Sequence, residues 1–350
     1  MILYLIGCES LGVRGLSCFI KLGSRSVLID PGVALGYTRY GLHPHPLQAA
    51  FSEITKVLLT SFWHRATDIV VTHFHGDHVP LYNANPFQLS LNLAKKLNDR
   101  ALLWVKDYSA LTSCERTRFE KLSEYFKSRI VYVNDEYASN DGLIEFSSTH
   151  PHGLSRSTRV MAVKVGEPPH SIVHLSDTQL LADGVIDKVR SWSPRVVITD
   201  GPPLYRLSGA VRQSVARKAV SNALRLADYA DYVIIDHHIA RSIEGMRWLD
   251  RLRREVGNRI MCAADYTKRP RLLLEAWRRI LYNVIPVPRN WFIISKYSGF
   301  GKAISSYGDV IEELVKSVPR EVTLDELEVK RILKDAVGDS RSYFRLWRYP

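Results

Sequence analysis

The sequence predicts an α/β fold in which layers of helices cover β-sheets. Short apolar runs that favour strands alternate with longer amphipathic stretches that favour helices. Several apolar runs end in a carboxylate or a histidine, so polar side chains would gather along one edge of the sheets. With 350 residues, 46% of them hydrophobic, the chain is long enough for one large domain or two modest ones around a sizeable core.

The first 150 residues are predicted to form mostly strands, interrupted by three helices. The segment 21–26 holds a glycine and two serines between two apolar runs, which is typical of a hairpin turn. The segment 109–127 has its apolar residues at the spacing of an amphipathic helix. The expected strands are 2–6, 17–22, 26–30, 69–71, 102–105, 130–133 and 142–147, and the expected helices are 46–66, 87–98 and 109–127.

The loop 33–46 is long and aromatic, and it is expected on the same rim as the polar strand ends. It carries Tyr37, Tyr40, His43 and His45. The two histidines have the spacing of a chelating pair, but prolines stiffen the loop and no carboxylate follows. A wall beside a substrate is therefore favoured over a metal site.

Beyond residue 150 strands and helices alternate regularly. Asp177, Asp200, Asp236 and Asp265 each stand at or just after the end of an apolar run. These positions again point to a site along one sheet edge. The expected strands are 159–165, 171–177, 195–199, 232–235 and 259–264, and the expected helices are 180–192, 209–228, 242–256 and 268–283.

Residues 284–350 are predicted to begin with a proline- and glycine-containing linker. Two short helices are expected at 309–317 and 324–337, and the second is preceded by the capping pair Thr323 and Glu326. The tail 341–350 holds four aromatic residues and three arginines. Since a solvated tail rarely exposes so much aromatic surface, we expect it to pack on its own domain or on a neighbouring subunit. Stacking on nucleic acid and a loose end are the alternatives.

Composition limits the partners, the kinds of cysteine site and the cellular compartment that we expect for the protein. The formal net charge is +12, but Lys and Arg are spread along the chain, so nucleic acid is only an alternative partner. The four cysteines have no Cys-x-x-Cys spacing, which argues against a zinc ribbon or a disulfide scaffold. No signal peptide and no apolar run of about 18 residues is visible, so we expect a cytoplasmic protein without a membrane partner.

The densest motif lies at 70–80, where three imidazoles and a carboxylate stand within six residues after an apolar run. In an extended loop, alternate side chains point the same way, so His73 and His75 would bind the same metal ion. Asp77 and His78 come after a change of chain direction and would face a second ion. Imidazole and carboxylate donors suit zinc, with iron or manganese as alternatives.

This His-x-His-x-Asp-His motif resembles that of the metallo-β-lactamase superfamily of binuclear metal hydrolases. The resemblance implies an αββα sandwich, two mixed β-sheets flanked by helices, over residues 1–282. Residues 283–350 would then be a C-terminal helical extension. Further stretches are similar to those of an uncharacterised archaeal branch: 9–14, 29–35, 39–42, 201–203 and 236–238.

The resemblance also implies how two metal ions would be held. The first ion would have three histidine ligands, the second would have an aspartate and two histidines, and one aspartate would bridge both ions. In that order the implied ligands are His73, His75 and His152, then Asp77, His78 and His237, and the bridging Asp177.

Two ligand positions stay open. His150 is an alternative to His152, although the glycine after His152 would allow close backbone approach. His238 is an alternative to His237, because the alternation of side chains along a strand does not show which of these two adjacent histidines faces the metal ions. His174 lies inside a predicted strand and is expected to be a packed core residue.

The implied reaction is hydrolysis by a hydroxide bridged between two ions about 3.5–4 Å apart. Asp77 would also hold the nucleophile. Asp200 departs from the branch pattern, where a small residue precedes Gly-Pro-Pro, and is predicted to orient a ligand histidine. Around the metals, the candidate substrate or oxyanion contacts are Arg14, Tyr205 and Arg241.

The sequence thus predicts a metal-dependent hydrolase that acts on an ester, a lactone or a phosphodiester. A nuclease of the same fold is the first alternative, and a basic stripe leading to the metals would favour it. A binding protein with a vestigial site is the second, and the full ligand set argues against it. A homo-oligomer is compatible with the sequence, which does not specify one.

Overall fold

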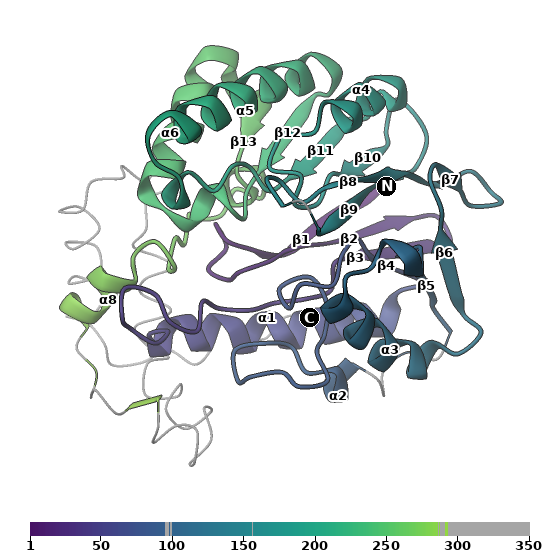
Figure 1. Ribbon diagram of the computed structural model, residues 1–350, viewed down its shortest axis with the longest axis horizontal. Coiled ribbons are helices and arrows are strands. Elements are labelled where there is room, and N and C mark those ends of the chain that lie inside the picture. The colour runs from purple at the N-terminus through teal and green to yellow at the C-terminus, as the bar shows by residue number, and fades with distance from the viewer. Residues whose placement is uncertain (95–97, 99, 156, 286, 288–290, 293–350) are drawn as a thin grey trace.

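The computed structural model describes residues 1–94, 98, 100–155, 157–285, 287 and 291–292. In this part of the chain, two β-sheets pack face to face and helices cover the outer face of each sheet (Figure 1). The arrangement is the αββα sandwich of two mixed sheets, so the predicted fold class is confirmed.

The first sheet has the strand order β1-β2-β3-β4-β5-β6. Its first three strands are antiparallel, and from β3 to β6 neighbouring strands are parallel. The parallel strands therefore end at one edge of the sheet. The strands are β1 Ile2–Cys8, β2 Leu16–Leu22, β3 Arg25–Ile29, β4 Asp68–Val71, β5 Leu102–Lys106 and β6 Ile130–Val133.

The second sheet has the order β13-β12-β11-β10-β9-β8-β7. Strands β10 to β13 are parallel, whereas β7 to β10 pair antiparallel. The strands are β7 Tyr137–Ala138, β8 Ile144–Pro151, β9 Arg159–Val165, β10 Ile172–His174, β11 Val196–Thr199, β12 Tyr232–Ile235 and β13 Ile260–Met261.

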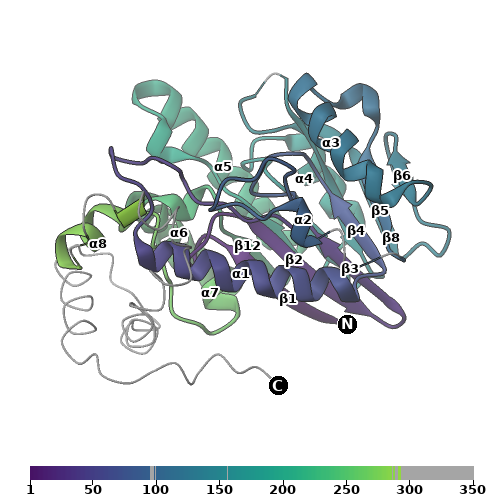
Figure 2. The same cartoon turned by 90° about the horizontal axis from the view of Figure 1, so that it is seen from below.

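Helices α1, α2 and α3 lie on the side of the first sheet, and α4, α5 and α6 lie on the side of the second (Figures 1 and 2). Several of them begin with a side-chain cap. Thr112 caps α3 in a reciprocal pair with Glu115, and Ser242 caps α6. The helices are α1 Pro46–Arg65, α2 Leu91–Ala94, α3 Ser113–Phe126, α4 Asp183–Trp192, α5 Gly209–Tyr229, α6 Ile243–Val256, α7 Ala263–Tyr266 and α8 Arg278–Val284, with single 3₁₀ turns η1 Tyr108–Ala110, η2 Leu204–Arg206, η3 Ile239–Arg241 and η4 Gly257–Arg259.

The central strands are buried on both faces, which explains their continuous apolar runs. In β4, Ile69 and Val71 pack with the helices, while Val70 lies in the cluster between the sheets. In β12, Ile234 lies in the same inner cluster. Each such side chain contributes about 1.5–3 kcal/mol by leaving water. A shift of one residue in the pairing of a strand would move its side chains to the opposite packed face. The pairing register is therefore fixed, and with it the positions of the strand ends.

Two predicted helices are wrong in part. Among the described residues of the segment 87–98, only Leu91–Ala94 is helical, because the backbone amide of Leu89 bonds to Val33 instead of to its own turn. The segment 268–283 becomes helical only at Arg278, because Leu272 bonds to the backbone of Ser10. Tertiary contacts override the helical pattern at both places.

Several strand predictions differ at their ends, and β7 was not predicted. The run 171–177 is a strand only at Ile172–His174, and the polar residues after it turn toward the sheet edge. The run 259–264 is divided between β13 and α7. Strand β8 continues beyond the predicted 142–147 as far as Pro151.

Both histidines of the loop 33–46 make structural contacts, and the wall predicted beside a substrate stays a prediction. His45 is buried and caps α1: its Nδ1 accepts from the amide of Leu47, and its Nε2–H donates to the carbonyl of Ile285 at 2.9 Å. The ring of His43 stacks on Phe292, with ring centroids 4.5 Å apart. These contacts anchor the loop to the chain after α8.

Burial lowers the pKa of His45 to about 4, although its bond to Ile285 acts in the opposite direction. Below pH ~6.5 the unfolded chain would bind a proton there that the folded chain excludes. We expect the stability that wild type has over His45→Gln to fall by roughly 3 kcal/mol from pH 7 to pH 4, since one pKa unit equals ~1.4 kcal/mol. Urea unfolding of both proteins across this pH range measures it. A difference that does not change with pH would contradict the prediction.

The predicted C-terminal extension falls largely outside the described residues. Trp291 and Phe292 are buried and pack with Leu35, Ala49 and Phe87. The two helices predicted at 309–317 and 324–337, and the tail 341–350, lie outside the described part, so the domain boundary at 282 and the packing of the tail stay predictions. Among the described residues, no helix combines the length and apolar character that a membrane crossing needs.

Candidate metal centre

The ends of parallel strands from both sheets meet at one edge, and polar residues follow them. Three of these residues adopt a left-handed backbone, which is unusual outside glycine: Asp30 with φ 48°, Ser176 with φ 53° and His237 with φ 55°. Such conformations cost of order 1–3 kcal/mol each and persist where the surroundings hold them. The chain therefore turns sharply where its polar side chains converge.

Asp30 fixes the loop that carries the densest motif. Its carboxylate accepts hydrogen bonds from the amide and the hydroxyl of Thr72, at 2.8 and 2.7 Å. It also lies 2.8 Å from Nδ1 of His78. Behind it, a Cβ on Gly32 would lie 2.3 Å from the backbone nitrogen of Val79, so only glycine fits there.

A second carboxylate supports the same loop from α3. Glu115 is buried and accepts from the amide of Phe74 at 3.3 Å and from the ammonium of Lys106 at 2.7 Å. One turn further along α3, Arg118 donates to the carbonyl of Phe74 at 2.6 Å. Both backbone polar groups of Phe74, which lies between His73 and His75, are thus held by α3.

The centre of the site is Asp177, which follows β10 and is 1% exposed. Five histidine Nε2 atoms surround its Oδ2. The distances are 3.1 Å for His152, 3.3 Å for His78, 3.6 Å for His237, 3.6 Å for His238 and 3.8 Å for His73.

Four overlapping groups of ligand atoms arise, and within each group all atoms lie within 4.8 Å of one another. Among the described residues, every ligand predicted from the sequence belongs to at least one of them, as does His238, the predicted alternative to His237; Asp30 is the addition. The groups are His73, His75, His152 and Asp177; Asp77, His78 and His237; Asp177, His237 and His238; and Asp30, His73 and His78.

The electrostatics suit cation binding. Burial, with the neighbouring histidines, lowers the pKa of His73 far below its usual value, and burial lowers the pKa of His75 to about 4. These rings are therefore neutral ligands at physiological pH. Burial would raise the pKa of Asp77, but His78, His237 and the nearby guanidiniums hold it well below the usual range.

Two buried atoms at the centre have no hydrogen-bond partner among the described residues: Nε2 of His78 and Oδ1 of Asp177. Their other polar atoms are occupied, since Nδ1 of His78 faces Asp30. Leaving such groups unpaired costs about 1–3 kcal/mol each. A cation between them would satisfy both, so the donor set fits one or more divalent ions.

The structure separates the two histidines that flank Pro151. His152 reaches Asp177, whereas His150 belongs to none of the ligand groups formed by the described residues. The ring of His150 instead lies 3.6 Å from where a Cβ on Gly184 would be.

The second pair, His237 and His238, is not separated, because both Nε2 atoms lie equally far from Asp177. His238 has its Nδ1 2.7 Å from a carboxylate oxygen of Asp200, an arrangement that orients metal-binding imidazoles. His237 instead lies against Arg241, whose Nη2 is 2.7 Å from its Nε2.

Arg241 joins the cluster to a further carboxylate. It is buried, and it donates to Glu9 at 3.0 Å through Nε and to Asp77 at 3.1 Å through Nη2. Within the described chain, Arg14 and Tyr205 do not hydrogen-bond to the ligand groups; both line a cavity beside them.

Sequence reasoning missed Asp30 and Glu115 as supporting residues, and it identified Asp236 only as one of the carboxylates at strand ends. Asp236 is buried and accepts from the amides of Ser10 and His237, at 3.0 and 2.7 Å. Asp30 follows β3 directly, so the strand-end rule that found Asp177 and Asp236 would also have found it. Glu115 gave only a helix-capping signal.

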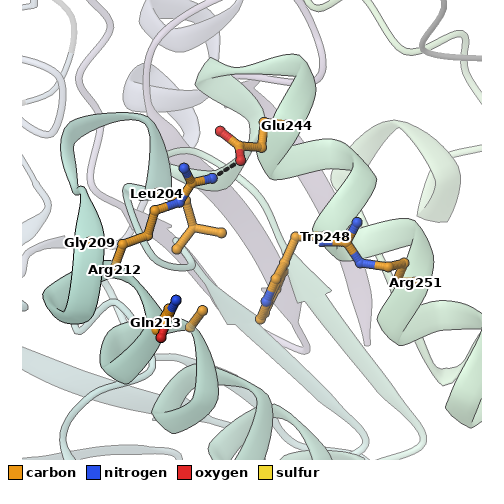
Figure 3. Close-up of a pocket in the computed structure, with 8 residues that line it drawn as sticks. Leu204, Gly209, Arg212, Gln213, Glu244, Trp248 and Arg251 are labelled. Carbon is orange, nitrogen blue, oxygen red and sulfur yellow. Dashed lines mark ion pairs between the residues drawn. The ribbon is translucent and has the colours of Figure 1, made fainter.

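A separate pocket lies between α5 and α6, where an ion pair joins Arg212 to Glu244 and Trp248 forms part of the wall (Figure 3). None of the residues in the ligand groups lines it. The candidate chemistry therefore belongs to the edge of the sheets and not to this pocket.

Comparison with other sequences gives archaeal relatives. The chain is similar to a UPF0282 protein of Methanosarcina mazei, with 38% identity over 289 residues, 82% of this chain and 93% of the relative. A UPF0282 protein of Pyrococcus furiosus is 31% identical over 287 residues, 79% of this chain and 90% of the relative. No family model matches the chain.

Among solved structures, Tm1679, a metal-dependent hydrolase of the β-lactamase superfamily, aligns with 75% of this chain and 96% of its own, with TM-score 0.44 and 13% identity. The Rm3 metallo-β-lactamase aligns with 65% of this chain and 93% of its own, with TM-score 0.33 and 10% identity.

Proposed function

The chain belongs to the UPF0282 family, and we propose that it is a metal-dependent hydrolase with two divalent ions in the site around Asp177. The observation that carries the proposal is the convergence of five histidine nitrogens within 3.8 Å of one carboxylate oxygen. Buried imidazole nitrogens that face one another without hydrogen-bond partners are costly unless a cation lies between them.

We assign one ion to His73, His75 and His152, and the other to Asp77, His78 and His237, with Asp177 shared. The arrangement of His238 against Asp200 makes it the alternative to His237, and Asp200 then orients it. Zinc suits these donors best, with iron or manganese as alternatives. Two such ions supply Lewis acidity and lower the pKa of a water molecule toward neutrality.

The chain's own residues would direct the reaction. Asp77 stays ionised and is placed to accept a hydrogen bond from the attacking water, which orients an oxygen lone pair toward the substrate. Arg241 is fixed by Glu9 and Asp77 and presents positive charge where an oxyanion would develop. The buried walls exclude bulk water and strengthen both effects.

The proposed substrate carries an ester, lactone or phosphodiester bond. A nuclease of the same fold is the alternative, and the net charge of +12 is the feature that favours it. A binding protein with a vestigial site is disfavoured by the complete donor set.

We expect the full-length protein, reconstituted with zinc and freed of excess metal, to hold two ions per chain, because two sets of donors lie around Asp177. Elemental analysis measures the ratio. The same sample should hydrolyse p-nitrophenyl acetate or bis(p-nitrophenyl) phosphate, and chelation should stop the reaction. A protein that retains no zinc after reconstitution would contradict both the site and the proposed activity.

A further inference from the structure

Beside the metal-ligand groups lies a cavity of about 440 Å³ that the metal chemistry does not use. Its walls come from the loop 33–46, from η2 and from the segment before α8. Three arginines, three tyrosines and one glutamate dominate the lining. The lining residues are Arg14, Gly36, Tyr37, Thr38, Arg39, Tyr40, Tyr205, Arg206 and Glu275.

The cavity has an excess of positive charge. Its one carboxylate, Glu275, pairs with Arg14 at 2.8 Å and lies 3.7 Å from Arg39. It also pairs with Arg278 behind the wall, at 2.6 Å. Arg206 is exposed and forms no ion pair with any residue of the described chain. Three guanidiniums therefore share the cavity with one carboxylate that is already bound on several sides.

Arg39 is held in place for contact with a ligand. Its guanidinium carbon lies 4.9 Å from the ring centroid of Tyr40 and 4.8 Å from that of Tyr205. Its Nη2 already donates to the hydroxyl of Tyr40 and to the carbonyl of Arg241, whereas its buried Nε has no hydrogen-bond partner among the described residues and is left to donate to an oxyanion. Tyr37 and Tyr40 are 42% and 45% exposed, so they also offer aromatic surface to a bound molecule.

The cavity is connected directly to the metal-ligand groups. Arg39 donates to the backbone carbonyl of Arg241 at 2.5 Å, and Arg241 donates to Asp77 at 3.1 Å. Arg14 also acts on Asp77 through its charge. A substrate group in the cavity would thus lie one arginine away from a proposed metal ligand.

We propose that this cavity binds a phosphate group and an adjoining aromatic ring of the substrate, so that the hydrolase acts on a small nucleotide-like phosphodiester. The inference rests on the proposed metal-dependent activity for the bond that is broken. Guanidiniums donate charge-assisted hydrogen bonds to phosphate oxygens, and exposed tyrosines match a flat base. The volume suits one small ligand.

In the reaction, a water oxygen forms a bond to the phosphorus that lies at the metal ligands, and the bond from that phosphorus to one ester oxygen breaks. The released oxygen takes a proton and leaves as an alcohol, and the other proton of the water is released. The phosphate and ring in the cavity take no part in bond breaking and position the substrate.

Titration calorimetry of AMP into the zinc-loaded, full-length protein tests the site. We expect wild type to bind AMP and Arg206→Gln to bind it roughly ten- to hundred-fold more weakly, because a hydrogen bond to a charged group is lost. Arg39→Gln should have an effect at least as large. Tyr37→Ala should weaken AMP binding but leave the affinity for inorganic phosphate unchanged, because the ring of Tyr37 lines the cavity but packs on His43 and Phe292 and does not hold Arg39.

Arg195→Gln is the matched control, since Arg195 is exposed and precedes β11 at the opposite end of the sheet. It lowers the net charge equally and should bind AMP like wild type. Equal AMP affinities for wild type and Arg206→Gln would place AMP elsewhere, at the metal ions for example, and overturn the inference. A single-stranded oligonucleotide that binds far more tightly than AMP, with Arg195→Gln weakened as well, would also overturn it and favour a nuclease.

Measuring AMP binding and ester hydrolysis on the same protein distinguishes the proposed phosphate site from the proposed hydrolase activity. If wild type binds AMP through Arg206 but hydrolyses no ester, the phosphate site stands and the hydrolase proposal fails. If wild type hydrolyses p-nitrophenyl acetate in a zinc-dependent way but does not bind AMP, the hydrolase proposal stands and the nucleotide-like substrate is excluded.

Discussion

Replacing Asp177 with alanine is expected to reduce hydrolysis by at least roughly a thousand-fold and to lower the zinc content below two ions per chain. Its carboxylate is the only acidic group within 4 Å of five histidine nitrogens in the described chain, so its loss removes the proposed bridge between the ions. Turnover of p-nitrophenyl acetate and elemental analysis on the same sample measure both effects.

A surface variant controls for a general effect of removing an aspartate. Asp187 lies on α4, and its exposed carboxylate pairs with Arg225. Asp187→Ala should retain two zinc ions and wild-type turnover, because exposed ion pairs contribute little. Wild-type turnover by Asp177→Ala would remove Asp177 from the mechanism, and the assigned metal ligands would then have to be revised.

Replacing Glu115 with alanine is expected to lower the free energy of unfolding by about 3–5 kcal/mol, the usual effect of leaving one partner of a buried ion pair behind. Lys106 would remain buried with its charge, and the amide of Phe74 would lose its acceptor. Because Phe74 lies between His73 and His75, zinc affinity should fall as well. Urea unfolding and zinc titration measure the two losses.

The double variant Lys106→Met/Glu115→Leu separates the effect of the unpaired Lys106 charge on stability from the effect of the position of Phe74 on zinc affinity. It removes both charges, so stability should recover most of the loss. The amide of Phe74 would still be unpaired, so zinc affinity should remain low. A double variant as unstable as Glu115→Ala would show that the ion pair is not the cause, and normal zinc affinity in both variants would contradict the role assigned to Phe74.

The fold was predictable because it depends on local patterns. Apolar runs such as Ile69–Val71 lie on strands buried on both faces, and sequence alone shows such runs. The motif from His73 to His78 was equally local, and the placement of Asp177 followed from its position after a strand.

The contacts between distant segments were not predictable. Asp30 and Thr72 are 42 residues apart, and Arg241 meets Glu9 across 232 residues. Which carboxylate supports which histidine depends on how two sheets align, and no spacing in the chain encodes it. The same reason explains the failed helix before Arg278, where Leu272 pairs with the backbone of Ser10 instead of with its own turn.

The contacts made by the chain after α8 determine where the polypeptide can be shortened. A protein that ended at residue 282 would lose the carbonyl of Ile285, which accepts from His45, and the aromatic rings of Trp291 and Phe292. Leu35 and Phe87, which pack against these rings, would then be exposed to water on the side of the first sheet. We therefore expect a piece that ends at residue 282 to be less stable than one that extends to Phe292, ten residues beyond the point where the similarity to the hydrolase superfamily was predicted to end.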